Sequence, residues 1–200
     1  MANLFKNQKN AALTPRQLYE SRYKSSRYNL ILVIAFTLVN MLLCLTNANT
    51  YFLFSASIPY LLTDLGMFLC GKYPEEFYLQ DEFNGMELLD SSFLTVMVVI
   101  AVVILALYFV CWLLSKKKVA WLITSLVFFG IDTIAMFLYF GITADIIIDI
   151  IFHAWVICYL AMGIHSHFKL KNLPEETFEA ETETYTEKAE SEVTDTNSEV

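Results

Sequence analysis

The chain has 200 residues, 56% of them hydrophobic, with a mean hydropathy of +0.51 and a formal net charge of −8. This composition excludes an ordinary soluble domain and is typical of an integral membrane protein, whose first partner is the lipid bilayer. It also argues against a nucleic-acid partner, because the basic residues form several short clusters and ten acidic residues follow Pro174.

Residues 1–27 form a basic N-terminal segment in which a helix is predicted to start. Thr14 suits the N-cap, Pro15 suits the first helical position, and Gln17 completes a capping box. We expect an amphipathic helix along the cytoplasmic leaflet, where each cation favours anionic lipid by on the order of 1 kcal/mol. A charged anchor that only sets the topology is the simpler alternative. The basic residues are Lys6, Lys9, Arg16, Arg22, Lys24 and Arg27.

Four apolar runs are long enough to cross the roughly 30 Å hydrocarbon layer as helices. They cover residues 28–46, 93–114, 119–140 and 146–164. The first run is longer than the apolar core of a signal peptide, and no small-residue cleavage pattern follows it closely, so an uncleaved anchor is predicted. The predicted fold class is therefore all-α, an integral membrane protein with four transmembrane helices.

The placement of basic residues predicts how these spans are oriented. Lysines lie between the second and third spans at Lys116–Lys118 and after the fourth at Lys169 and Lys171. The charged residues of the loop 47–92, in contrast, are mostly acidic. Basic loops stay on the cytoplasmic side of a membrane. Both termini are therefore predicted to lie in the cytoplasm (N-in and C-in). Within the membrane domain 28–164, the loop 47–92 is predicted to lie outside.

Residues 51–70 of the outer loop are apolar enough to suggest a fifth span, but they contain Pro59 and Asp64. A crossing here would move the lysines at 116–118 to the outside. The segment is therefore predicted to be re-entrant or interfacial. Irregular backbone at membrane depth is tolerated only where it packs against protein or lines a cavity, so a re-entrant segment must pack against the spans.

Ionisable residues lie within the last two spans. Asp145, Asp149 and His153 follow an i, i+4 spacing and share one face of the fourth span. Asp132 and His153 each lie about ten residues from the intervening turn, roughly 15 Å along a helix, so they are predicted at the same depth. Whether they face each other does not follow from the spacing. Ionisable groups at such depth usually face a bundle interior or a water-filled path.

These four residues, with Asn40 of the first span as a neutral ligand, are the candidate site, and three interpretations remain open. In a packing role, Asp145 favours the positive end of the fourth helix, Asp149 pairs with His153, and Asp132 bonds Asn40 or a neighbouring hydroxyl. In a proton- or cation-handling role, Asp132 and His153 share a proton and the other aspartates extend the path outward. A metal site is the third interpretation, although compact metal motifs are missing.

Residues 165–200 are predicted to be a cytoplasmic acidic tail that is disordered, because it has too few large apolar residues to form a core. The cysteines do not follow a zinc or redox pattern. Free, buried thiols are expected, with a disulfide between Cys44 and Cys70 as the alternative.

The run Phe52–Tyr60, together with Ile131–Thr133 and Asp149–His153, resembles small, functionally uncharacterised multi-span membrane proteins of Gram-positive bacteria. The resemblance implies a bacterial plasma membrane as the location. It implies no activity, cofactor or site residue.

The leading functional hypothesis is a non-enzymatic integral membrane protein that acts by association, either with itself as a homo-oligomer or with a larger membrane complex. Four spans with little soluble domain leave few other surfaces on which to act. The alternative is a small proton- or cation-coupled transporter or channel that uses Asp132, Asp149 and His153. A membrane-embedded enzyme ranks third, and no cofactor or metal is expected.

Overall fold

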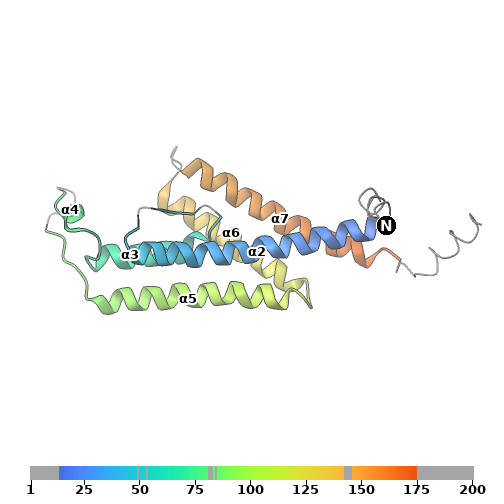
Figure 1. Cartoon of the computed structure of the whole chain (residues 1–200), viewed down its shortest axis with the longest axis horizontal. Coiled ribbons are helices and arrows are strands. Elements are labelled where there is room, and N and C mark those ends of the chain that lie inside the picture. Colours follow the sequence, from blue (N-terminus) through green and yellow to red (C-terminus); the bar gives the residue numbers. More distant parts are fainter. Residues whose placement is uncertain are drawn as a thin grey trace, which may run out of the picture. The chain divides into compact units, whose positions relative to one another are not determined.

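The computed structural model describes residues 14–48, 50–52, 54–80, 83, 85–141 and 146–174. In this part of the chain every regular element is a helix (Figure 1), and four of the helices are long and apolar enough to cross a membrane. The predicted all-α class with four such helices is confirmed. The chain up to Leu170 forms one compact unit, to which the following description applies. The helices are α2 (Pro15–Leu45), α3 (Ser57–Leu69), α4 (Glu75–Tyr78), α5 (Ser91–Leu114), α6 (Ala120–Phe140) and α7 (Ile147–Lys171).

Helix α2 begins at the predicted capping box. The Thr14 hydroxyl accepts a hydrogen bond from the Gln17 amide, and the Gln17 side chain accepts one from the Thr14 amide, both at 3.2 Å. The helix then runs unbroken for 31 residues to Leu45. No Gly or Pro interrupts it after Pro15. The N-terminal basic helix and the first span are therefore one helix about 46 Å long.

Polar contacts hold the start of α2 against the end of α5. The Tyr23 hydroxyl donates to the Ser115 carbonyl at 2.5 Å, and Arg27 donates to the Ser115 hydroxyl at 2.8 Å and to the Trp112 carbonyl at 3.2 Å. The ring of Tyr23 also lies 5.4 Å from that of His167 near the end of α7. We call this end of the helices, with the lysine turn after α5, the basic end.

The other end of the helices is held by loop contacts. The Asn47 side chain donates to the Lys72 carbonyl at 2.9 Å, and the Leu89 amide donates to the Leu69 carbonyl at 2.8 Å. These bonds join the end of α2, the end of α3 and the approach to α5. Since α4 lies between Lys72 and Leu89 in the sequence, we call this the α4 end.

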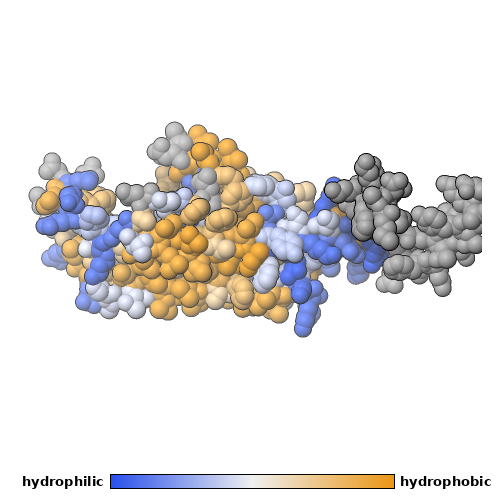
Figure 2. Space-filling model, in the orientation of Figure 1, coloured by the Kyte–Doolittle hydropathy of each residue, from blue (hydrophilic) through white to orange (hydrophobic). Residues whose placement is uncertain are grey.

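The long helices expose broad apolar surfaces between the two ends. In α5 only one narrow face is buried, and side chains on the other faces, such as Val99 and Val103, are more than half exposed. Figure 2 shows an apolar surface over the middle of the helices, with hydrophilic residues toward each end. Apolar faces of this extent suit an apolar surround, and the helices that carry them are long enough to span a bilayer. The buried face of α5 consists of Ala101, Leu105, Tyr108 and Cys111.

Helices α2, α6 and α7, together with the buried face of α5, form one apolar core. At the closest approach, a Cβ added to Gly163 of α7 would lie 2.3 Å from the Ser26 Cβ of α2, so only glycine allows this contact. Close backbone approach at small residues is the usual way in which helices pack in a membrane. The core side chains of these three helices include Leu30, Val33, Leu122, Phe129, Val156 and Leu160.

The segment 51–70 does not form a continuous helix. Non-helical residues precede α3, which has 13 residues and is therefore about 20 Å long, too short to cross the hydrocarbon layer. Helix α3 packs beside α2 and α5 (Figure 1), and its first turn reaches α6. A fifth spanning helix is thus excluded for these residues.

Helix α7 is longer than predicted, because it continues past residue 164 to Lys171. The first residues of the predicted disordered tail are therefore helical, and residues 175–200 lie outside the described part of the chain. Cys44 and Cys70 are both free thiols, so the disulfide alternative is not realised.

Candidate functional site

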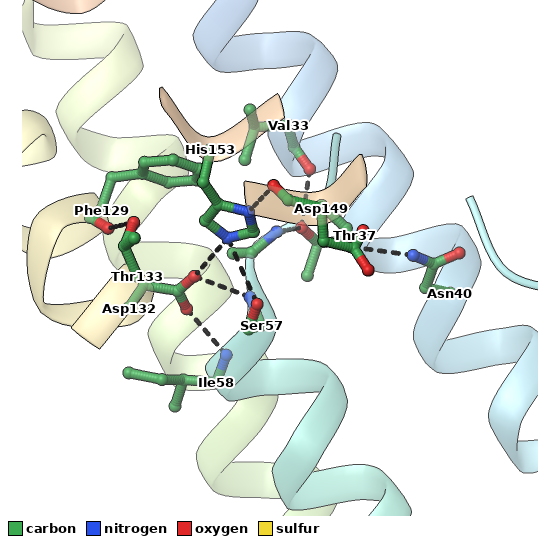
Figure 3. A network of polar contacts seen from close by, with 12 residues as sticks. Val33, Thr37, Asn40, Ser57, Ile58, Phe129, Asp132, Thr133, Asp149 and His153 are labelled. Atoms are coloured by element: carbon green, nitrogen blue, oxygen red, sulfur yellow. Dashed lines mark hydrogen bonds and ion pairs between the residues drawn. The ribbon is translucent and has the colours of Figure 1, made fainter. Parts of the chain in front are cut away.

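The first turn of α3 lies buried between the long helices. Ser55, Ala56 and Ser57 expose at most 2% of their surface. A helix start leaves its first N–H groups without partners inside the helix, and buried backbone groups need partners. Here the partners are polar side chains of α2 and α6 (Figure 3), with α7 completing the cluster. We call this cluster the α3 centre; it consists of Thr37, Asn40, Ser57, Asp132 and His153.

Asp132 of α6 caps α3. Its two carboxylate oxygens accept hydrogen bonds from the Ser57 and Ile58 amides, both at 2.7 Å, and the residue is 1% exposed. Helix N-termini carry a partial positive charge, and amide donors to an anion make strong hydrogen bonds. The Asp132 side chain thus supplies the partners of the first two amides of α3. In Figure 3, Asp132 reaches from its helix directly toward the start of α3.

His153 of α7 lies against the other side of Asp132. Its Nε2 atom is 3.5 Å from the Asp132 Oδ2 atom and 3.3 Å from the Ser57 hydroxyl. Its Nδ1 atom is 2.9 Å from the Asp149 backbone carbonyl, which can only accept, so Nδ1 carries a proton. The Phe129 ring stacks on the imidazole with ring centroids 5.0 Å apart. The imidazole is thus held in one orientation on all sides.

The contacts of His153 are compatible with two protonation states. When Nε2 carries a proton, it faces the Asp132 carboxylate as an ion pair, and the Ser57 hydroxyl can accept. When Nε2 has no proton, the Ser57 hydroxyl can rotate and donate to it. The Nε2 atom therefore has a hydrogen-bonding partner within reach in either state, and a buried polar atom without one would be costly.

Asn40 and Thr37 of α2 hold the chain that leads into α3. The Asn40 side chain accepts from the Phe52 amide at 2.8 Å and donates to the Phe52 carbonyl at 2.7 Å and the Ser55 hydroxyl at 2.9 Å. The Thr37 hydroxyl accepts from the Ala56 amide at 2.7 Å. These side chains replace the partners that water would otherwise supply to non-helical backbone.

A cavity of about 330 Å³ lies next to the α3 centre and includes Ser57 in its wall. The partly exposed Asp149 side chain also lines it, and no described residue hydrogen-bonds to this carboxylate. A second hollow shares Tyr51 and Tyr60 with the cavity and extends to Asn47 at the α4 end. The cavity walls are formed by Tyr51, Ser57, Tyr60, Met136, Phe140, Ile146 and Asp149.

The structure brings some of the candidate residues together and separates others. Asp132 and His153 lie at the same level, as the residue count predicts, and they also face each other. Asp149 contributes its backbone carbonyl to His153 and not its carboxylate. Asn40 binds the loop and does not bond Asp132. Asp145 lies outside the described residues.

Asp132 does not make the packing contacts that the sequence suggested, which were bonds to Asn40 or to a neighbouring hydroxyl. The hydroxyl next to Asp132 is that of Thr133, and it donates to the Phe129 carbonyl instead. The partners that sequence reasoning missed are Ser57 and the first amides of α3. Pro59, which falls in the first turn of α3, is the signal that a helix starts inside the segment 51–70.

A smaller polar cluster lies near the α4 end. The Tyr73 hydroxyl donates to the Asp64 carboxylate and lies 3.7 Å from the Cys44 thiol. Burial, together with the Asp64 contact, raises the pKa of Tyr73 above its ordinary value. Among the described residues, no group of three or more His, Cys, Asp or Glu side chains is placed to hold a metal ion.

No protein-family model, curated protein or solved structure matches this chain, so the geometry alone supports the functional proposal below.

Proposed function

We propose that this chain is a small proton- or cation-coupled transporter or channel, with the α3 centre as its proton-handling site. The observation that supports this most directly is the pair of hydrogen-bonding arrangements open to His153 beside Asp132. Ionisable groups at membrane depth are costly and mark proton or ion paths when they are present. A buried histidine that has a hydrogen-bonding partner within reach in both protonation states suits such a path.

The proposed topology places the basic end in the cytoplasm and the α4 end outside, in a bacterial plasma membrane. The contacts of Arg27 with Ser115 bring two basic clusters to one end, as the positive-inside rule requires. In this arrangement α3 is a re-entrant half-helix that starts near Asp132 and returns to the outer side. Asp132 lies eight residues before the end of α6, about 12 Å from that end.

This arrangement couples protonation to the position of α3. The Asp132 carboxylate accepts from two α3 amides and also faces His153, so a change of charge on His153 alters the field at the α3 cap. The packed side chains of Phe129 and Leu160 lie on the basic side of the imidazole. In the proposed transporter, the cavity, whose wall includes Ser57, would supply the path from the outer side to the α3 centre.

The association hypothesis rests on the exposed apolar faces of the long helices. Lipid covers such faces equally well, so they do not distinguish a partner protein from the bilayer. The α3 centre has no need of polar partners beyond those that it already contacts. It therefore adds nothing to an association role, whereas it supplies the proton site that a coupled transporter needs.

The proposal is tested by proton flux into proteoliposomes that contain a trapped pH-sensitive dye. We expect a pH gradient to drive dye quenching with the wild-type protein. Asp132→Asn and His153→Ala are each expected to reduce the rate at least about tenfold, because each removes one partner of the proton-bearing pair. Asp90→Asn, a change at the exposed cap of α5, serves as the control and should leave the flux unchanged.

Correct folding of each variant is checked by its elution volume and helical circular dichroism in detergent. Equal flux in wild-type, His153→Ala and protein-free liposomes would overturn the proposal. Loss of a defined oligomer in the same variants, without any flux in the wild type, would support association instead.

A further inference from the structure

The cavity beside the α3 centre combines aromatic rings with a carboxylate, and its described wall has no cation. Tyr51, Tyr60 and Phe140 come from three different parts of the chain, and Asp149 comes from α7. The rings of Tyr51 and Tyr60 lie edge to face with centroids 5.0 Å apart. Neither Lys nor Arg is among those lining residues that the structure describes. The field in the cavity therefore favours a positively charged ligand.

The nearby charges strengthen this preference. The Asp132 carboxylate is occupied by two α3 amides and His153 and does not line the cavity, whereas the Asp149 carboxylate does. That carboxylate has no hydrogen-bonding partner among the described residues. Aromatic faces attract cations, and this attraction increases when the site is shielded from water. A carboxylate with several rings around it is suited to an ammonium group that carries alkyl substituents.

The size and polarity of the cavity limit the ligand further. Its volume of about 330 Å³ is at the lower end of the range for small-molecule sites. Met136 and Ile146 supply apolar wall, which an inorganic ion with its tightly held water would not use. The second hollow, which shares Tyr51 and Tyr60, extends toward Asn47 at the α4 end.

We infer that this cavity binds a small organic ammonium cation, with the charge at Asp149 and the alkyl groups against Tyr51, Tyr60 and Phe140. The inference rests on the proposed function and names the substrate class of the same transporter. It places the cation next to Ser57, which contacts His153 on its other side. Bound cation and bound proton would thus be neighbours in one site.

The test uses choline and its neutral isostere 3,3-dimethylbutan-1-ol, which have the same shape but differ in charge. Calorimetric titration of the full chain in lipid nanodiscs should show choline binding, and the isostere should bind at least about tenfold more weakly. Asp149→Asn is expected to weaken choline binding about tenfold or more. Tyr60→Leu should weaken it several-fold, whereas Tyr60→Phe keeps the ring and should bind as the wild type does.

Asp90→Asn is the control, because this carboxylate lies at the cap of α5 and does not line the cavity. Absence of choline binding, equal binding of the neutral isostere, or unchanged binding by Asp149→Asn would each overturn the inference. Proton flux measured on the same protein separates the two proposals. Flux without choline binding refutes only the cation site, whereas choline binding without flux refutes only the proposed function.

Discussion

The α3 centre and the basic end both join helices through polar side chains, but they do so in different surroundings. At the basic end, Arg27 and Tyr23 bond the last turn of α5, and the lysines beside them are exposed. At the α3 centre, Asp132 and His153 are 1% and 3% exposed and bond the first turn of α3. At the basic end, a guanidinium and a phenol bond the end of a helix among exposed lysines. At the α3 centre, a carboxyl side chain bonds the start of a helix in the buried interior.

The comparison indicates that the energetic effect of losing a polar contact depends on how deeply the contact is buried. Near water, a lost hydrogen bond is replaced by solvent or a lipid headgroup, so the net effect is small. In the interior, a lost partner leaves a charge or an amide without any replacement. The α3 centre, which also has more polar contacts than the basic end, should therefore dominate the stability of the fold.

The largest effect is expected for Asp132→Ala, which removes the cap of α3 and the partner of His153 together. We expect the free energy of unfolding to fall by about 3–5 kcal/mol, because two amides and an imidazole lose their buried partner. The measurement is SDS-induced unfolding in mixed micelles, followed by circular dichroism. Asp90→Ala removes the corresponding cap of α5 at an exposed position and should have a much smaller effect. Similar losses in both variants would contradict the contrast between depths.

An intermediate effect is expected where α2 and α7 touch at Ser26, which lies between Tyr23 and Arg27 of the basic end but is itself buried. In Gly163→Ala the new Cβ would lie 2.3 Å from the Ser26 Cβ, so the helices must separate, at a cost of about 1–3 kcal/mol. Gly130 of α6 is the matched control, since a Cβ there meets no atom within 4 Å. Gly130→Ala should leave the stability unchanged or raise it by up to about 1 kcal/mol, because alanine favours helix. Equal destabilisation by both changes would show that the contact is not close.

The smallest effect is expected for Arg27→Gln at the basic end. It removes the hydrogen bonds to Ser115 and Trp112 and the contact of the guanidinium with the Trp112 ring, whose centroid lies 5.7 Å away. Because water and headgroups can replace these contacts, the stability should fall by only about 1 kcal/mol in the same unfolding measurement. A loss as large as that of Asp132→Ala would mean that this end is as dry as the α3 centre.

Much of the fold could be predicted from the sequence, because its strongest signals are local. The capping box at Thr14 lies within four residues, and the four apolar runs are continuous, so neither depends on distant parts of the chain. The depth match of Asp132 with His153 also followed from counting residues along two helices joined by a short turn. Such features need only helix geometry and the thickness of a bilayer.

The α3 centre could be predicted only in part, because it depends on long-range contacts. The Ser57 amide bonds Asp132, which lies 75 residues away in the sequence, and no local sequence pattern predicts this pairing. The spacing of Asp149 and His153 suggested a side-chain pair. Instead, the His153 ring contacts the Asp149 backbone carbonyl, and the Asp149 side chain lines the cavity. Helix rotation, which the sequence leaves open, decides between these outcomes. The capping box marks where α2 begins, but no local signal shows that the basic turns and the first span form one unbroken helix.

The unbroken course of α2 has a mechanical consequence. A continuous helix transmits rotation and tilt along its length, since each residue is hydrogen-bonded to the next turn. Thr37 and Asn40, which fix the chain before α3, therefore sit on the same rod as the basic turns around Arg27. Any force that twists the basic turns, whether from anionic lipid or from a bound protein, turns the two side chains that anchor the buried loop. The basic turns and the side chains that hold the loop are therefore parts of one continuous helix.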